Sequence, residues 1–438
     1  MSLKPFVVST SAPSVQEQKL DKRTKIIDAA ASTFLRLGFG ETSLDDIVEQ
    51  SGVVKQTIYN YFENKEALFL AAVDYLLAKN SAELFPPELQ GLEPKEFFEK
   101  IGKQLIKTIT EPAMRDFLSL LVQECRRFPA LQQIYAEKIP RPFVDTVKSY
   151  LLSRGTALSE RNAETLSWAF RLSITGFATL SNLSGLLPYP VPNRSRYLQT
   201  AGSSYAALLN LSFNLAAGDP ARTVTAFESA EDADAMTAFF QPQKEELGEK
   251  KLQIMQAAIN LLSKKGLADT SMEEIAAQAK VSKQTVYKHF RSKNFLYSFL
   301  CKSISTELLA QNLVTEDCSL SEFVQHFFVT LSDSCARPWI REYLRMLFGE
   351  AKAFPVEAGT MLLFIIEHGR SQLESRLRKE LAGSDIDFES ASVILRCTMG
   401  SFILLNQIFV VAENQFLNQN SLLEILEVLV QEIRKNES

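Results

Sequence analysis

The sequence predicts an all-α protein of two tandem units, each a three-helix domain followed by a larger helical bundle. Two observations predict this. One segment of the chain occurs twice, and no stretch shows the sustained two-residue alternation and tight Asn-Gly turns of β-hairpins. The 438 residues also suffice for several domains, each large enough to bury its own core.

The repeat is much longer than its most obvious phrase, KQTIY at residues 55–59 and KQTVY at residues 283–287. A shift of 228 positions aligns residues 24–69 with residues 252–297 without a gap, and 16 positions are identical. Weaker echoes follow: QECRRFPAL at 123–131 matches GEAKAFPVE at 349–357, and ITGFATL at 174–180 resembles TMGSFILL at 398–405. The chain is therefore interpreted as an internal duplication.

Each element of the repeated segment has a local reason to form, as the first copy shows. The first helix carries one apolar stripe at helical spacing, formed by Ile26, Ile27, Ala30 and Phe34. Gly38 follows its last turn, where a helix end favours a residue that tolerates positive φ. A capping signal formed by Thr42, Ser43, Asp45 and Asp46 then begins a second helix. This helix ends at Ser51-Gly52. A third helix is expected over residues 55–62 and a fourth from ENKEAL at residues 63–68, so the second and third form a helix-turn-helix.

The third helix is short, and its polar side chains suit a DNA groove. Ile58 and Phe62 can anchor it, while Gln pairs well with adenine and Lys, Thr and Tyr commonly hold phosphates. Lys65 opens the next helix, whose N-terminus also favours a phosphate. The residues expected to contact double-stranded DNA are Thr42, Ser43, Lys55, Gln56, Thr57, Tyr59, Asn60, Tyr61 and Lys65, and in the second copy Thr270, Ser271, Lys283, Gln284, Thr285, Tyr287, Lys288, His289 and Lys293.

The alternative for this helix is a solvated face on an ordinary bundle helix. Two copies that both keep polar positions such as Gln56 and Gln284 weigh against it, because a solvated face has no reason to retain them.

The repeated segment resembles the DNA-binding domain of the TetR/AcrR family of bacterial transcriptional regulators over about 46 residues in each half. The family pattern falls on Ala29, Ala30, Phe34, Gly38, Thr42, Ser43, Ile47, Val53, Thr57, Tyr59, Tyr61, Phe62, Asn64, Lys65 and Leu68. The second copy supplies Ala257, Ala258, Gly266, Thr270, Ser271, Ile275, Val281, Ser282, Thr285, Tyr287, His289, Phe290, Ser292, Lys293 and Leu296. The resemblance implies a DNA-binding domain followed by an all-helical regulatory domain that dimerises and usually binds a small effector.

Together the repeat and the resemblance predict six segments. They are a flexible tail at 1–22, a first helix-turn-helix domain at 23–70, a first regulatory domain at 71–213, a linker at 214–246, a second helix-turn-helix domain at 247–298 and a second regulatory domain at 299–438. ECRRFP at residues 124–129 is similar to the regulatory domain of one subgroup, although a helix stopped by Pro129 explains the same residues.

The two copies depart from the family pattern at different places. Val54 stands where the family usually has Ser, and it cannot cap the third helix, while Lys280 replaces the glycine of the turn. Residues 21–70 carry 6 basic and 8 acidic residues, a net charge of −2; residues 249–298 carry 9 basic and 4 acidic residues, a net charge of +5. The second copy is therefore expected to contribute more of the non-specific DNA affinity.

A chain with two such domains is expected to act as a single-chain pseudo-dimer, in place of the two-fold homodimer that reads a pseudo-palindrome. The copies differ at Asn60/Lys288 and Tyr61/His289, so the operator half-sites should be similar but not identical. A higher oligomer stays open. So does the alternative that the acidic first copy has lost DNA binding and serves dimerisation or protein contact.

Other classes of protein are disfavoured. The three histidines, His289, His326 and His368, form no catalytic or metal motif, and the last two are expected as core residues on apolar helices. No cofactor or metal is expected. Five scattered cysteines, no signal peptide and no apolar run of membrane length predict a cytoplasmic protein, nucleoid-associated when bound to DNA.

The bundles also hold aromatic clusters, which are more often core than pocket. A small apolar effector between helices is nonetheless expected from the resemblance, with repression as the expected mode of action. The clusters are Trp168, Phe170 and Phe177, and Phe323, Phe327, Phe328 and Trp339.

Overall fold

The computed structural model describes residues 15–81, 87–125, 127–154, 158–182, 193–207, 239, 247–310, 318–351, 353–367, 369–380, 388–409, 422 and 425–426. Within these ranges every regular element is helical, which confirms the all-α class. The chain divides into two compact units, Met1–Ala82 and Glu83–Ser438. Of the linker expected at 214–246 the structure describes only Phe239, whose ring lies 4.8 Å from that of Trp339.

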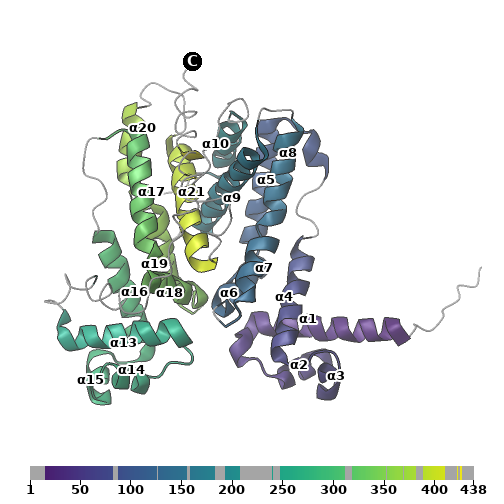
Figure 1. The fold of residues 1–438 in the computed structure, drawn as a ribbon, viewed down its shortest axis with the longest axis vertical. Helices are drawn as coiled ribbons and strands as arrows, with labels where there is room; N and C mark the ends of the chain where they lie inside the picture. The colour runs from purple at the N-terminus through teal and green to yellow at the C-terminus, as the bar shows by residue number, and fades with distance from the viewer. Residues whose placement is uncertain are drawn as a thin grey trace, which may run out of the picture. The chain divides into compact units, whose positions relative to one another are not determined.

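The first unit contains the first helix-turn-helix and the helix that follows it (Figure 1). Its helices are α1 (Val15–Glu41), α2 (Leu44–Ser51), α3 (Lys55–Tyr59) and α4 (Lys65–Ser81). The helix α1 begins inside the segment expected as a tail. Its apolar stripe is buried, and the helical path breaks at Gly38, whose φ of 77° a glycine adopts readily. Because α4 packs along α1, the compact unit extends to Ala82, beyond the boundary expected at residue 70.

The second unit begins with the first helical bundle. Its elements are the 3₁₀ helix η1 (Pro87–Gly91), α5 (Pro94–Thr110), α6 (Pro112–Glu124), α7 (Ala130–Lys138), α8 (Arg141–Ser153), α9 (Glu160–Asn182) and α10 (Arg194–Ala207). The helix α9 packs against α5 and α8, and stacked rings fill the core, as in Phe97–Tyr150 with centroids 3.5 Å apart. As expected, a helix ends before Pro129, since α6 stops at Glu124 and α7 starts at Ala130.

The same unit contains the second helix-turn-helix and the second bundle. The helices are α13 (Glu249–Lys265), α14 (Met272–Gln278), α15 (Lys283–His289), α16 (Lys293–Ala310), α17 (Leu320–Ala336), α18 (Pro338–Gly349), α19 (Pro355–Glu367), α20 (Arg370–Glu380) and α21 (Phe388–Phe409). The first helix of this domain, α13, packs on α18 of its own bundle.

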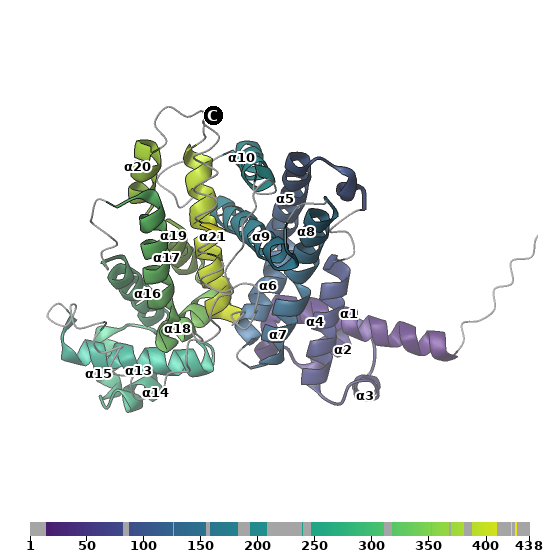
Figure 2. The same ribbon diagram turned by 45° about the horizontal axis from the view of Figure 1, so that its top comes forward.

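The two bundles pack on each other within the second unit. The helix α9 lies along α21, and α6 lies against α18 (Figure 2). A side chain at Gly176 could not be accommodated, because its Cβ would be 2.6 Å from Cys397 Cβ and 2.7 Å from Ser401 Oγ. Glycine therefore lets the backbones of α9 and α21 approach closely.

Two further expectations are settled by these helices. His326, expected as a core residue, is exposed on α17, because it faces away from the buried stripe that contains Phe323 and Phe327; His368 lies outside the described residues. Among the described residues, no helix could span a bilayer. The expected aromatic clusters are buried in the bundle cores.

Candidate nucleic-acid interface

Both helix-turn-helix motifs are built by the same local devices. Ser43 caps α2 and Ser271 caps α14, each in a reciprocal capping box with the acid three residues later. In the second copy Glu274 also bonds the Lys265 ammonium, and these contacts lower its pKa to about 2, with Lys265 contributing most. The capping serines are thus engaged with their own helices through their hydroxyl groups.

The third helix of each motif, α3 or α15, is called the recognition helix below. The turn before it needs a residue in the left-handed backbone conformation. Gly52 supplies it in the first copy with φ 69°, whereas Lys280 is forced to φ 53° in the second. Lys280 is the one non-glycine residue with positive φ in the described part of the chain, and such a residue costs roughly 1–2 kcal/mol. The turn survives because the amide of Val281 still donates to the carbonyl of Ala276, at 3.0 Å.

The two recognition helices, α3 and α15, begin at aligned positions but differ in their N-caps and in where they end. Val54 makes no side-chain cap, as expected, and α3 spans 5 residues before the chain turns at Asn60. Ser282 accepts a hydrogen bond from the amide of Thr285 at 3.1 Å, and α15 spans 7 residues, to His289. The helix expected over residues 55–62 is therefore shorter in the first copy.

Each recognition helix is anchored by one face and presents the other to solvent. Ile58 and Phe62 are buried as expected, as are Val286 and Phe290 at the matching positions. The residues predicted for DNA contact that are exposed are Lys55, Gln56, Tyr59 and Asn60, with Thr57 and Tyr61 half-buried. Their counterparts Lys283, Gln284, Tyr287 and Lys288 are likewise exposed, and Thr285 and His289 are half-buried. The geometry thus brings the predicted polar side chains onto one accessible surface in each copy.

Both recognition helices begin with a lysine paired to an acid of the preceding helix. Lys55 Nζ lies 3.1 Å from Asp45 Oδ2, and Lys283 forms the corresponding pair with Glu273. The hydrogen bond from Lys283 lowers the pKa of Glu273, and Glu273 in turn raises the pKa of Lys283. The acidic partners were not predicted, although an acid stands ten residues before the lysine in both copies of the sequence.

Two threonines and two lysines among the residues predicted to contact DNA also form hydrogen bonds inside their own domains. Thr42 and Thr270 are buried, and their hydroxyls donate to the carbonyls of Gly38 at 2.6 Å and Gly266 at 2.7 Å. Lys65 and Lys293 are half-buried, and their ammonium groups donate to the carbonyls of Thr42 at 2.6 Å and Thr270 at 2.8 Å. Each lysine thus fastens the start of its helix to the turn before α2 or α14.

A repeated cation beside each recognition helix was missed. Arg23 lies over the ring of Phe62 at 5.4 Å, and Lys251 lies over the ring of Phe290 at 5.8 Å. The two cations are at matching positions, one residue before the aligned segment began, so a longer alignment would have found them. In the second copy, burial and then the charges of Lys251, Lys288 and Lys250 lower the pKa of His289.

Comparisons with known proteins agree with this geometry. Residues 26–72 and residues 254–298 both match the family described as bacterial regulatory proteins, tetR family. Residues 96–157, which include ECRRFP, match the C-terminal domain described as that of an AefR-like transcriptional repressor.

Individual relatives are similar over short stretches. The chain is 32% identical over 107 residues to the uncharacterized HTH-type transcriptional regulator YerO of Bacillus subtilis, covering 24% of this chain and 36% of that protein. It is 39% identical over 74 residues to the HTH-type transcriptional repressor ComR of Escherichia coli, covering 16% and 35% respectively. For the Escherichia coli regulator RutR the identity is 41% over 56 residues, covering 13% and 26%.

The chain thus spans little more than a third of the length of these relatives at most. Both family matches coincide with the two recognition helices and their supporting helices. The chain therefore carries the DNA-binding domain of the tetR family of bacterial regulatory proteins twice.

Proposed function

We propose that this protein is a sequence-specific repressor whose two helix-turn-helix domains bind the two half-sites of one operator, so that a single chain replaces the usual homodimer. One observation carries the proposal. Both recognition helices of the one polypeptide expose the same polar side chains. These are Lys55, Gln56 and Tyr59 in the first copy and Lys283, Gln284 and Tyr287 in the second.

The packing of the two bundles supports the pseudo-dimer. In a two-fold dimer, residues on the axis contact their own counterparts. Here Gly349 lies against Gln123, the residue that opens the matching stretch of the first half, with a Cβ at Gly349 only 3.2 Å from Gln123 Cα. The helices α9 and α21, which carry the other matching stretches, also pack together. Contacts between matching stretches are what the proposed pseudo-dimer requires.

Joining the two helix-turn-helix domains in one chain has a kinetic and a thermodynamic consequence. The second half-site is reached in an intramolecular step, so affinity no longer depends on dimerisation at low protein concentration. Because the recognition helices differ at Asn60/Lys288 and Tyr61/His289, the half-sites should be related but unequal.

The first test combines selection of bound sequences from random DNA with paired variants. Gln56→Ala/Tyr59→Ala removes exposed groups from α3, and Gln284→Ala/Tyr287→Ala removes the matching groups from α15. Each double variant should weaken binding to the selected operator by about 100-fold or more, given roughly 1–3 kcal/mol for each good contact. Each should also relax sequence preference in one half-site only.

A second candidate function has a specific basis. The first copy is acidic and its recognition helix lacks a cap, so it could serve protein contact while the second copy alone reads DNA. In that case the Gln56→Ala/Tyr59→Ala variant would keep the wild-type affinity and footprint, while Gln284→Ala/Tyr287→Ala would lose both.

Release by an effector completes the proposal. The AefR-like match covers α5 to α8, the helices that line the first bundle with α9. A ligand that prefers one arrangement of these helices would shift operator affinity only through that preference.

A further inference from the structure

One face of α9 carries three buried polar atoms that have no hydrogen-bond partner. They are Trp168 Nε1, Arg171 Nε and Thr175 Oγ1. The three residues are spaced by three and four positions, so they line the same side of the helix. Buried hydrogen-bond donors are nearly always paired in native proteins, so a row of three unpaired donors on one helix points to a missing acceptor.

Arg171 is the central residue of this row. It is 5% exposed, its guanidinium lies 5.8 Å from the Phe143 ring of α8, and it donates to the hydroxyl of Tyr135 on α7. Burial lowers its pKa, and the neighbour that offsets this effect is the tyrosine hydroxyl rather than a carboxylate. A buried cation without a negative partner is costly, so its retention needs another explanation.

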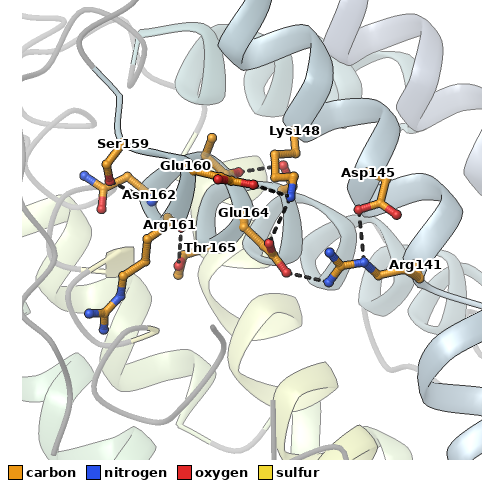
Figure 3. A network of polar contacts seen from close by, with 11 residues as sticks. Arg141, Asp145, Lys148, Ser159, Glu160, Arg161, Asn162, Glu164 and Thr165 are labelled. Atoms are coloured by element: carbon orange, nitrogen blue, oxygen red, sulfur yellow. Dashed lines mark hydrogen bonds and ion pairs between the residues drawn. The ribbon is translucent and has the colours of Figure 1, made fainter. Parts of the chain in front are cut away.

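The same helix shows how a buried charge is normally matched. Two turns before Arg171, Glu164 receives Arg141 Nη1 at 2.5 Å and Lys148 Nζ at 3.2 Å (Figure 3). The pairing satisfies a carboxylate whose side chain is only 2% exposed. Arg171 has no such arrangement around it.

The second half of the chain has different residues at the positions that match this row. With Gly176 aligned to Gly400, the matching positions hold Ser392, Leu395 and Met399. The buried arginine of α21 is Arg396, one position later, and it is ion-paired with Glu367 of α19. The unmatched cation is therefore a property of the first bundle.

We propose that the face of α9 formed by Trp168, Arg171 and Thr175 binds an organic anion, a single carboxylate on an apolar body, as the effector. The carboxylate would accept hydrogen bonds from Arg171 Nε, Trp168 Nε1 and the Thr175 hydroxyl. One buried cation matches one negative charge, and the neighbouring Phe143 ring suits an apolar body. One chain binds one anion, because the second bundle has leucine in place of the arginine.

The position of Tyr135 gives the anion a way to act. A carboxylate that bonds both Nε and an Nη of Arg171 would compete with the hydroxyl of Tyr135 on α7. The loop just before α7 carries Arg127, whose Nη2 lies 3.6 Å from Asp269 Oδ2 in the second helix-turn-helix domain. Displacement of α7 would therefore affect the position of the second helix-turn-helix domain first. This role rests on the proposed function as a repressor.

The first experiment needs no ligand. Arg171→Leu, which copies the residue of the second half, should raise the melting temperature by roughly 2–4 °C, because it removes an unmatched buried charge. Arg396→Leu is the control and should lower it, because Glu367 loses a paired cation. A lower melting temperature for Arg171→Leu would show that the arginine is structural and would overturn the proposal.

The second experiment adds benzoate and octanoate as probes, with benzamide and octanamide as neutral controls. At least one carboxylate should raise the melting temperature of the wild-type chain, bind at one molecule per chain by calorimetry, and lose at least about 100-fold in affinity in Arg171→Leu. Equal effects of acids and amides, or no effect of either acid, would overturn the anion site. Operator binding by the wild-type chain is measured separately, so failure of the repressor proposal is distinguished from failure of this one.

Discussion

The second recognition helix ends in His289, whose pKa is held below its ordinary value by burial and by the lysines around it. Two of these, Lys250 and Lys251, belong to α13, and Lys288 is its neighbour on α15. No carboxylate contributes to the shift. In the free protein the imidazole is therefore neutral at pH 7, and a nearby phosphate would favour its protonation.

Operator affinity should consequently rise as the pH falls from 8 to 6. DNA phosphates raise the pKa of His289 above its value in the free protein, so binding takes up a proton, and mass action then favours the complex at lower pH. Fluorescence anisotropy at constant salt measures this as a severalfold gain. His289→Tyr, which copies Tyr61 of the first copy, should remove the gain; an unchanged pH profile in that variant would contradict the assignment.

The folding stability of the free protein should respond in the opposite direction. Unfolding returns His289 to its ordinary pKa of about 6.5, above its folded value, so the unfolded chain binds the proton more tightly. The stability contributed by the neutral imidazole is present above this pH and is lost as the pH falls through the folded pKa. The same residue thus links acid to weaker folding and to tighter DNA binding.

Helices α3 and α15 differ at the residue that precedes each of them. They share Lys-Gln-Thr and Tyr, yet α15 is two residues longer than α3, since it spans 7 residues and α3 spans 5. The extra residues of α15 lie at its C-terminal end, because both helices begin at aligned positions; at the N-terminal end Ser282 provides a side-chain cap and Val54 does not. Val54 is 67% exposed, so its side chain adds little packing in return.

A reciprocal exchange tests this reading. Val54→Ser should stabilise α3 by about 1 kcal/mol and slow amide exchange at Thr57, because a hydroxyl then accepts from the first turn. Ser282→Val should weaken α15 by a similar amount and speed exchange at Thr285. Hydrogen exchange followed by mass spectrometry measures both. Equal protection of Thr57 in wild type and Val54→Ser would refute the role given to the cap.

The elements were largely predictable because their causes are local. Apolar spacing, the Ser43 and Ser271 caps and the turn at Gly52 all act within a few residues, and the helices begin and end close to where these devices stand. The inward direction of Lys65 was not predictable, because its acceptor at Thr42 is 23 residues away and meets it only in the folded domain. Arg171 is similar: a sequence shows an arginine on an apolar helix but not whether a carboxylate reaches it.

At the scale of the whole molecule, the pseudo-dimer that we propose would make a subunit interface internal to one chain. Matching helices of the two bundles pack on each other, and Gly349 meets its counterpart Gln123. The halves have meanwhile diverged: the second helix-turn-helix domain is basic and the first is acidic, and Leu395 stands at the position that matches Arg171. A fused chain permits such division of roles, because the two copies no longer share one sequence.

The claim that both recognition helices engage one duplex is tested most directly by varying the spacing of the half-sites. Affinity is measured for the selected operator, for each half-site alone, and for operators lengthened by about 5 and about 10 base pairs, roughly half and one helical turn. The full operator should bind at least about 100-fold more tightly than either half-site, as expected for a tethered second reader. Adding half a turn should abolish most of this gain and a full turn should restore part of it, with one chain per duplex throughout. Equal affinity for the full operator and the better half-site, at every spacing, would contradict the account.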